Sequence, residues 1–260
     1  MTFSGLGSDY APASRQAGMS LVELMVSMVI GLMLVLMVTQ YLIASRQSYQ
    51  SSMANGEAQD ARRFALNLVQ HQLWLAGYSD DWSDFDVAFP TFESEDARVP
   101  SFEKAQLVAS TGDDVWVRYR APALADQPSN HCDGTVFSGE EGGANAIAMT
   151  RLYLDGDTLR CKVYFAGRDP NNSLPLLNDV DAVRWSFFDQ DDRWKAPADV
   201  DWRSVRAIRL TAILASHEGS GERFEQQFDW GEKTLGFDDG RARALAEITT
   251  TLRNLPERSR

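Results

Sequence analysis

The chain has few of the residues from which most metal sites are built. Its 260 residues include two cysteines, Cys132 and Cys161, and three histidines, His71, His131 and His217. A structural zinc site usually takes four Cys or His ligands, and these five residues show neither C-x-x-C nor H-x-x-x-H spacing. We therefore expect no transition-metal site.

The sequence also lacks the common signatures of catalysis. It contains no G-x-S-x-G nucleophile elbow, no P-loop and no Rossmann fingerprint. His131 lies next to Cys132, but a nucleophile and its base are neighbours in space rather than in sequence. We therefore predict that the protein is not an enzyme and that it uses no cofactor.

Basic residues are scarce as well. Lys and Arg number 25 against 37 Asp and Glu, which gives a formal net charge of -12 at pH 7. A surface this acidic repels phosphate at long range, so we expect no direct nucleic-acid binding. With 44% hydrophobic and 24% charged residues, the composition is that of a globular protein. It excludes a wholly disordered chain and a multi-span membrane protein.

One long apolar run lies near the N-terminus. Residues 19–38 contain five of the eight methionines, and between Leu24 and Val38 only Ser27 and Gly31 interrupt the apolar side chains. Twenty residues of helix measure about 30 Å, the thickness of the hydrocarbon core of a bilayer. The run predicts one membrane-spanning helix, which we place at about residues 19–44.

The small residues lie on the wrong side of this run for a removable secretory signal. Such a signal is cut after its apolar core, at an A-x-A-like site. Here Ala11, Ala13 and Ala17 come before the core, and polar residues follow it. We therefore expect residues 1–18 to form a polar leader and the apolar helix to stay in the mature protein.

Glu23 places a carboxylate inside the apolar run. At the centre of a membrane helix an acidic residue costs roughly 2.5–3.5 kcal/mol, and less near the ends. In one interpretation Glu23 simply reaches the headgroups at the membrane boundary. In the other, cleavage after Gly18 gives Met19 a free amine four residues away on the same helix face. That amine pairs with Glu23 within one chain or in a neighbouring chain.

The residues around this point resemble the type III signal of type IV prepilins and pseudopilins. The pattern of that signal is Gly, an apolar residue, Ser or Thr, Leu, any residue and Glu, and this chain has Gly18, Met19, Ser20, Leu21, Val22 and Glu23. Met19 stands where Phe is most frequent. The resemblance implies cleavage by a prepilin peptidase between Gly18 and Met19, N-methylation of Met19, and a role for Glu23 in the register of filament assembly.

The body of the chain resembles PilW-type minor pilins. The similar segments are residues 179–185, 205–210 and 249–254. This resemblance implies a minor pilin of a type IV pilus, acting in a complex that initiates or caps pilus assembly for adhesion, twitching motility or DNA uptake. One alternative is a J-type minor pseudopilin of a type II secretion system. An alternative of another class is a single-span envelope protein with a binding or enzymatic periplasmic domain.

The same resemblance implies where the protein lies and what it meets. Before assembly it is expected in the bacterial inner membrane, crossing once, with the globular domain in the periplasm. After assembly it is expected in the pilus fibre, at or near the tip. The implied partners are other minor pilins, the major pilin, the prepilin peptidase, the inner-membrane assembly platform and a possible tip adhesin.

Beyond the apolar run, residues 45–78 predict an amphipathic continuation of the helix. Gly77 suits its C-terminal cap, and Gly31 and Gly56 are points where it is able to bend. The predicted amphipathic stripe consists of residues at 3–4 spacing with flanking apolar positions: Ala61, Phe64, Ala65, Leu66, Leu68, Val69, Gln72, Leu73 and Leu75. Within it, residues 66–75 are expected to form the core spine onto which a sheet packs.

The rest of the chain predicts a β-rich domain. Alternating patterns indicate about seven strands, at residues 115–119, 146–154, 158–165, 182–188, 205–214, 223–230 and 244–252. The fold class is thus α+β: a long N-terminal helix, membrane-spanning in its first half and amphipathic in its second, packed on an antiparallel β-sheet domain. The expected parts are a leader at 1–18, a helix at 19–78 and a globular domain at 79–260.

Three further features of this domain have plain and specific interpretations. Cys132 and Cys161 are the only cysteine pair; outside the cytoplasm a disulfide is favoured over two buried thiols, with about 3–4 kcal/mol of stabilisation. The acidic residues 79–106 predict a solvated connector rather than a calcium loop. We expect three tryptophans to serve in packing rather than as a ligand-stacking surface: Trp185, Trp194 and Trp202. We expect three aspartates to lie at a solvated hairpin tip rather than in a cation site: Asp189, Asp191 and Asp192.

Overall fold

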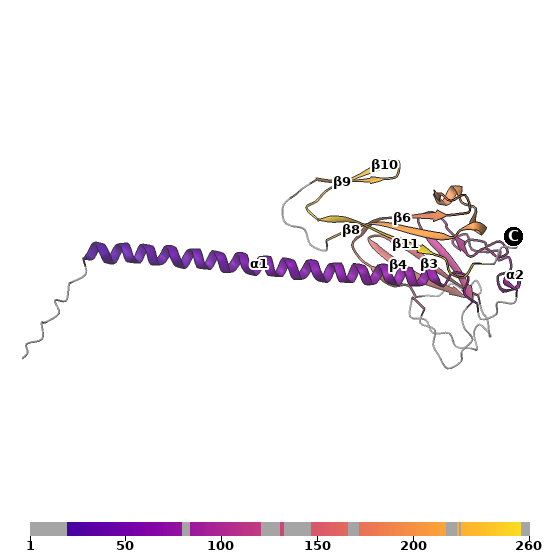
Figure 1. The fold of residues 1–260 in the computed structure, drawn as a ribbon, viewed down its shortest axis with the longest axis horizontal. Helices are drawn as coiled ribbons and strands as arrows, with labels where there is room; N and C mark the ends of the chain where they lie inside the picture. Colours follow the sequence, from indigo (N-terminus) through magenta and orange to yellow (C-terminus); the bar gives the residue numbers. More distant parts are fainter. Residues whose placement is uncertain are drawn as a thin grey trace, which may run out of the picture. The chain divides into compact units, whose positions relative to one another are not determined.

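The structure is a computed structural model that describes residues 20–79, 84–120, 131–132, 147–165, 172–216, 223 and 225–255. The chain divides into two compact units, residues 1–56 and residues 57–260. The first unit contains the N-terminal part of the helix α1. The second contains the end of that helix and all of the strands (Figure 1).

The helix α1 runs from Leu21 to Trp74 without interruption. It is continuous through Gly31 and Gly56, the two expected weak points. Its end is fixed by Gly77, which has a left-handed backbone with φ of 73°. The Gly77 N–H donates to the carbonyl oxygen of Arg118 over 2.9 Å, so the chain leaves the helix directly beside the sheet.

The second half of α1 buries a narrower stripe than the sequence predicts. Its buried residues are Ala65, Val69, Gln72 and Leu73, and Ala76 just beyond its end is buried as well. Phe64, a flanking position of the predicted amphipathic stripe, is 69% exposed. At about 100° per residue, Phe64 lies to one side of the buried residues.

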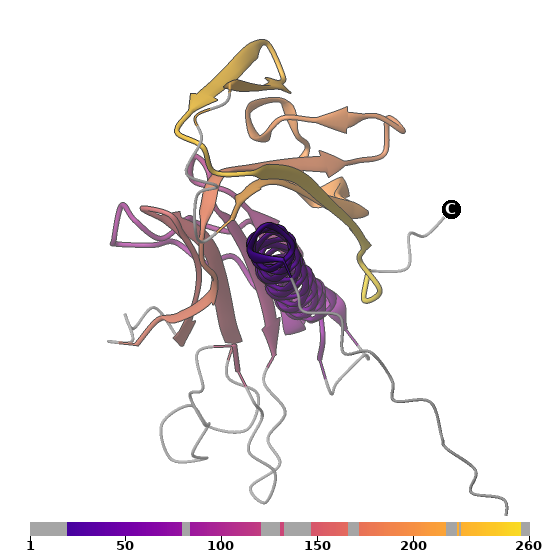
Figure 2. The ribbon, with the colours of Figure 1, turned by 90° about the vertical axis from the view of Figure 1, so that its left-hand side faces the viewer.

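Three antiparallel sheets form the rest of the second unit (Figures 1 and 2). The five-stranded sheet has the order β1 (Val108–Ala109), β2 (Val115–Arg120), β3 (Ile147–Asp155), β4 (Thr158–Phe165) and β5 (Leu174–Leu177). The four-stranded sheet has the order β11 (Arg243–Thr251), β8 (Ala207–Ala215), β6 (Val180–Phe188) and β7 (Trp194–Lys195). The hairpin of β9 (Glu225–Trp230) and β10 (Lys233–Asp238) stands as a sheet of its own.

The expected α+β fold is confirmed, while the single sheet of about seven strands is corrected. The described residues form eleven strands in three sheets. Four of the strands carry weak signals: β1 and β7 have two residues each, β5 contains Pro175, and β10 is mostly polar. A single sheet was expected because the sequence gives no sign of where strand pairing stops.

The main core of this unit lies between the two larger sheets, and the end of α1 fills it. Figure 2 looks along α1 and shows the five-stranded sheet on one side of the helix and the four-stranded sheet on the other. Val69 and Leu73 of α1 pack with Val117 of β2, Leu210 of β8 and other buried residues in one cluster. Burial of this apolar surface is what joins the helix to both sheets.

The acidic connector is folded rather than simply solvated. It contains the short helix α2 (Phe85–Ala88) and an antiparallel bridge between Phe92 and Phe102. Phe89 and Phe102 are buried. The expectation took account of the carboxylates in this segment and overlooked the aromatic side chains between them, which turn inward.

One buried arginine organises this connector. Arg118 of β2 is fully buried and donates to the carbonyl oxygens of Pro90 at 2.7 Å, Glu103 at 3.2 Å and Phe89 at 3.3 Å. Its guanidinium also lies over the ring of Phe102, 5.0 Å from the centroid. Burial lowers the pKa of Arg118 to about 10. The group remains charged at neutral pH, and its donors bind three backbone carbonyls of the connector.

Candidate functional site: the apolar N-terminal helix

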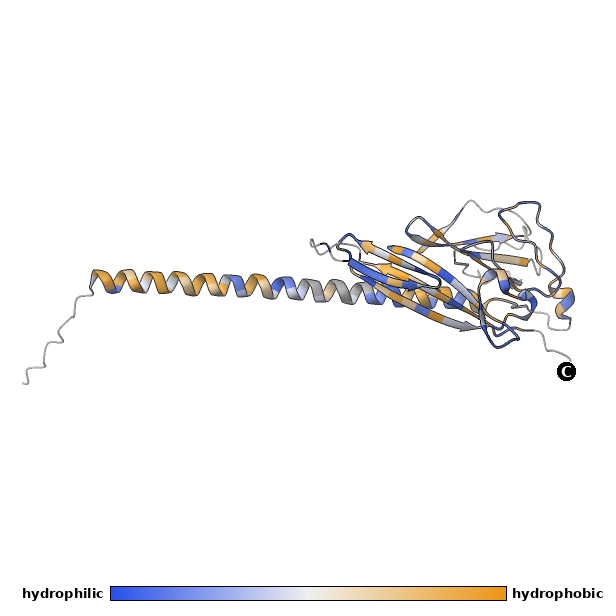
Figure 3. Cartoon of the chain, turned by 90° about the horizontal axis from the view of Figure 1, so that it is seen from above, coloured by the Kyte–Doolittle hydropathy of each residue, from blue (hydrophilic) through white to orange (hydrophobic). Residues whose placement is uncertain are grey.

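The part of the first unit that the structure describes is a predominantly apolar helix. Every side chain that the structure describes from Leu21 to Tyr49 is exposed. By length and composition, Leu21–Tyr49 is able to cross a membrane, and Figure 3 shows this part of α1 as predominantly hydrophobic. Exposed apolar surface on this scale in water is unfavourable, so this helix is suited to lipid or to packing against other helices.

Two hydroxyl groups within this stretch donate hydrogen bonds to carbonyls of the helix itself. Ser27 donates from Oγ to the carbonyl oxygen of Leu24 over 2.9 Å. Thr39 donates from Oγ1 to the carbonyl oxygen of Val35 over 2.7 Å. Each hydroxyl thereby finds an acceptor without water, which an apolar environment requires.

Glu23 lies in the first turn of α1, where the helix dipole favours a negative charge. The turn is closed by the Leu24 N–H, which donates to the carbonyl oxygen of Ser20 over 3.1 Å. Between Leu21 and Tyr49 the only other charged side chain is Arg46. The two charges are 23 residues apart, or about 34 Å along a helix. They therefore bracket an uncharged stretch that matches a bilayer core.

The predicted processing residues Gly18 and Met19 lie outside the described residues, so the structure gives no distance between the Met19 amine and Glu23. Glu23 itself is described and is exposed on the helix. The predicted pairing of the amine with this carboxylate therefore stays a prediction.

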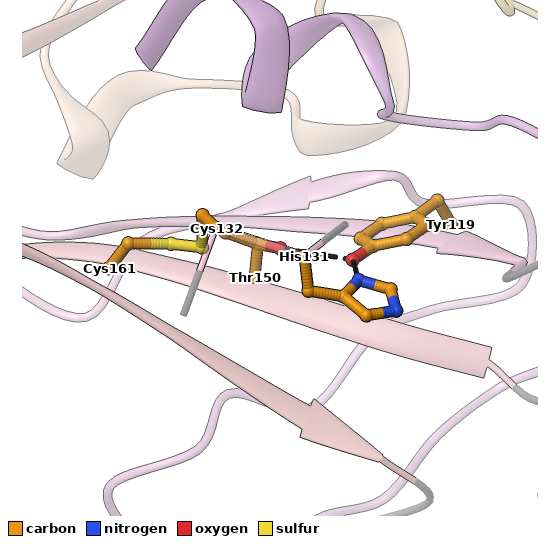
Figure 4. Close-up of a disulfide and its surroundings, with 5 residues drawn as sticks. All are labelled: Tyr119, His131, Cys132, Thr150 and Cys161. Atoms are coloured by element: carbon orange, nitrogen blue, oxygen red, sulfur yellow. Dashed lines mark hydrogen bonds between the residues drawn. A yellow bond between two sulfur atoms is a disulfide. The ribbon is translucent and has the colours of Figure 1, made fainter. Parts of the chain in front are cut away.

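The second unit contains the predicted disulfide between Cys132 and Cys161, shown in Figure 4. Cys161 lies on β4, and the two Cα atoms are 6.0 Å apart. Both cysteines are buried. The bond removes Cys132 as a nucleophile, so the adjacent His131 has no thiol to activate.

His131 instead takes part in a buried polar contact. Its Nδ1 lies 2.7 Å from the Tyr119 hydroxyl, and Thr150 Oγ1 lies 3.4 Å from the same hydroxyl. His131, Tyr119 and Thr150 are all buried. Figure 4 shows them beside the disulfide, above the strands of the five-stranded sheet. The disulfide thus holds the histidine against the tyrosine.

Two of the aspartates expected at a hairpin tip form ion pairs with the same lysine, Lys195. Lys195 Nζ lies 2.6 Å from Asp189 Oδ2 and 2.5 Å from Asp191 Oδ2. The hydrogen bond from Lys195 holds the pKa of Asp189 below its usual value. Asp192 lies 4.0 Å from Arg206. Lys195 therefore occupies the position between Asp189 and Asp191 that a bound cation would take.

Each of the three tryptophans packs against a different partner. Trp185 is buried and donates from Nε1 to the carbonyl oxygen of Asp113 over 3.1 Å. Trp202 packs edge-on against Phe187 with ring centroids 4.8 Å apart. Trp194 lies under the guanidinium of Arg209, 3.9 Å from Cζ to the ring centroid. These contacts agree with the predicted packing role.

A cluster of ion pairs at the start of β11 was not found from the sequence. Arg243 pairs with Asp181 at 2.6 Å and with Asp239 at 2.6 Å, and its side chain is only 3% exposed. Arg241 pairs with Asp179 at 2.5 Å. Hydrogen bonds from Arg243 hold the pKa of Asp239 well below its usual range. Asp181 and Arg243 are 62 residues apart, a separation at which no local pattern reveals a pair.

Comparison with known proteins places the N-terminal segment in a class. Residues 13–39 match the family model described as the prokaryotic N-terminal methylation motif. No curated protein matches the chain significantly. Among solved structures, a type IV-like pilin from Thermus thermophilus is similar at 17% sequence identity, with a TM-score of 0.48; the match covers 76% of this chain and 96% of that one.

The N-terminal segment of the chain thus carries a prokaryotic N-terminal methylation motif. The motif implies processing by a prepilin peptidase and assembly into a pilus. Together with the long apolar helix, the motif is consistent with an inner-membrane protein that later enters a pilus.

Proposed function

We propose that the protein is a PilW-type minor pilin, which acts in a complex that initiates or caps a type IV pilus. The observation that carries the proposal is one continuous helix with two different environments. Its N-terminal part, from Leu21 to Tyr49, is exposed and apolar and overlaps the methylation motif matched at residues 13–39. Its C-terminal part is buried in the α+β domain.

In this proposal the apolar part of α1 moves from lipid into a bundle of equivalent helices. Removal of residues 1–18 leaves a free and then methylated amine at Met19. Because a carboxylate is unfavourable in an apolar bundle unless it is paired, Glu23 takes such an amine as its partner. The pair fixes the axial position of the subunit relative to its neighbours.

The domain at residues 79–260 then determines which subunits lie next to this one. It is rich in buried β-structure and stabilised by a disulfide, which suits a periplasmic and later extracellular location. Its partners are other minor pilins and the major pilin, supported by the inner-membrane assembly platform. Adhesion, motility and DNA uptake are the processes that such a pilus serves.

Complementation of a deletion strain of the native host tests this role. We expect the intact gene to restore surface pili and twitching motility. Glu23→Ala should fail to restore them, although the protein is made and is inserted in the membrane. As a control, Glu57→Ala changes a carboxylate elsewhere on α1 and should restore pili fully.

Two other results would contradict the proposal. Normal pili with a loss of protein secretion in the deletion strain would identify the protein as a secretion pseudopilin. Full activity of Glu23→Ala in every assay would favour the single-span envelope protein.

A further inference from the structure

The four-stranded sheet ends in a long strand whose outer edge pairs with no other strand among the residues that the structure describes. β11 (Arg243–Thr251) is the outermost strand and pairs on one side with β8 along all nine residues. Figure 2 shows it at one end of its sheet. A strand edge of this length carries a row of backbone donors and acceptors that is able to pair with another strand.

The direction of the backbone groups follows from the bonds at the two ends of β11. The Ser216 N–H donates to the Ala242 carbonyl over 2.7 Å, and the Leu252 N–H donates to the Arg206 carbonyl over 2.8 Å. Even-numbered residues of β11 therefore face β8. Because antiparallel strands alternate, the N–H and C=O groups of Leu245, Glu247, Thr249 and Thr251 face outward.

At one end of this outer edge, the backbone groups of Arg243 already have hydrogen-bond partners. The Arg243 N–H donates to Gln226 Oε1 over 3.0 Å, and Gln226 Nε2 donates to the Arg243 carbonyl over 3.5 Å. The side-chain amide of Gln226 thus stands where a neighbouring strand would place its peptide group. The outer edge that remains open extends from Leu245 to Thr251, about 20 Å at 3.3 Å per residue.

The other sheet edges have features that disfavour pairing with a further strand, and β11 lacks these features. β1 and β7 have two residues each, and β5 contains Pro175. The β9–β10 hairpin carries the exposed charges Glu225, Asp229, Lys233 and Asp238. Short length, proline and exposed charge are the usual devices against edge pairing.

The open part of β11 has one charged residue, Glu247, which pairs with Arg209. Glu247 lies 3.5 Å from Arg209 Nε, and Arg209 also donates to Thr249 Oγ1 over 3.2 Å. Leu245 is 53% exposed, although it lies in a sheet that buries most of its apolar side chains. Threonine at positions 249–251 favours extended structure. The strand therefore has outward N–H and C=O groups that are able to pair with another strand, and the exposed side chain of Leu245 lies beside them.

We propose that the outer edge of β11 accepts an extended strand from a different pilin-like subunit, which extends the four-stranded sheet across a subunit interface. This inference rests on the proposed function, because it takes the occupant from the same complex. The chemistry that fits is an uncharged or basic strand. Its backbone pairs with Leu245, Glu247, Thr249 and Thr251, and it places an apolar side chain on Leu245. An acidic strand would meet Glu247 and a chain of net charge -12.

Photo-crosslinking in the native host tests the edge with the full-length chain. A benzophenone amino acid at position 245 should form a crosslink to another pilin-like subunit, with the crosslinked peptide in an extended segment of that subunit. The same amino acid at position 87 is the matched control, since Val87 is also an exposed apolar residue, at 68%, and lies on α2. We expect no crosslink to the same subunit from position 87.

Proline distinguishes backbone pairing from contact of side chains alone. Thr249→Pro removes an outward N–H that makes no bond to β8, so the internal ladder is kept. The yield of the crosslink should fall by at least about tenfold, which corresponds to about 1.4 kcal/mol. Thr249→Val keeps the N–H, and its yield should stay within about twofold of the original. Thr251→Lys is a second variant that leaves the backbone intact and should also lower the yield.

Several results would overturn the proposal. These are a crosslink to no pilin-like subunit, a crosslink between two copies of this chain, and a yield that Thr249→Pro leaves unchanged. The mass of the same protein samples separates the two failures. If residues 1–18 are removed but no crosslink forms, only the proposal that β11 accepts a strand is refuted. A chain that keeps those residues refutes the proposed function, and the edge proposal falls with it.

Discussion

Asn254 closes the end of α1 at the place where Gly77 leaves it. Its side-chain amide donates to the carbonyl oxygens of Trp74 at 3.0 Å and Ala76 at 3.1 Å, two acceptors that the helix leaves without a partner. A Cβ atom on Gly77 would collide with the backbone carbonyl oxygen of Asn254 and would lie 2.7 Å from Leu107 Cδ1. The segment after β11 therefore fits against the end of the helix only because position 77 has no side chain.

Replacement of this glycine should be costly for two separate reasons. Gly77→Ala forces a left-handed backbone on alanine and also creates the collision. Gly112→Ala is the matched control, because Gly112 has φ of 93° and nothing within 4 Å of its added Cβ. We expect the control to lose about 1 kcal/mol of unfolding free energy, and Gly77→Ala to lose at least about 2 kcal/mol more. Denaturant unfolding of the processed chain in detergent measures both, and equal losses would show that Asn254 does not crowd position 77.

Asn254 itself should be sensitive to loss of its donors. Asn254→Ala removes both hydrogen bonds to the helix end and should reduce the unfolding free energy by about 1–2 kcal/mol. Asn254→Asp should be worse at neutral pH, because the carboxylate is unable to donate and places a negative charge at the C-terminal end of the helix dipole. Thermal unfolding of the two variants at pH 7 gives their order. A more stable Asn254→Asp would contradict the assigned role.

The sequence was sufficient for some parts of the fold and insufficient for others. Gly77 was predictable as a helix end because it follows an amphipathic pattern. Asn254 was not, because its partners lie 178 and 180 residues away. The strands β3 and β4 were predicted within one residue, since apolar and polar residues alternate along them. β10 was missed, because its polar residues and Gly236 give no strand signal.

The candidate site shows the same division. Glu23 and the apolar helix were evident because both are local properties of the sequence. The Arg243 cluster and the open edge of β11 depend on which strands become neighbours, which local patterns do not determine. Phe64 flanks the predicted amphipathic stripe, and only the direction of the helix face places it at the surface.

The Asp239–Arg243 pair predicts a dependence of stability on pH. The pKa of Asp239 is lowered in the folded chain by Arg243. The stability that this pair contributes is therefore present above the usual aspartate pKa near 4 and is lost as pH falls below it. Asp239→Asn should lower the melting temperature at pH 6 and have a smaller effect at pH 2. Asp238→Asn is the control, since Asp238 is an exposed neighbour, and should have little effect at either pH.

The disulfide predicts a large effect of reduction. Replacing both Cys132 and Cys161 with alanine should reduce the unfolding free energy by about 3–4 kcal/mol, because the bond closes a loop of about 30 residues in the unfolded chain. Tyr119→Phe removes only the hydroxyl that contacts His131, so it should have a smaller effect of about 1 kcal/mol. Denaturant midpoints under oxidising and reducing conditions test both. A wild-type midpoint that reduction leaves unchanged would contradict the stabilising role.

The central claim is that the chain is processed as a prepilin, and the mass of the mature protein tests it most directly. The full chain is expressed with and without an active prepilin peptidase, and its intact mass and N-terminal sequence are determined. We predict that with the peptidase the chain begins at N-methylated Met19, and that without it residues 1–18 remain. Gly18→Ala should keep the leader under both conditions. A wild-type chain that retains residues 1–18 in the presence of a peptidase active on a control prepilin would contradict the claim.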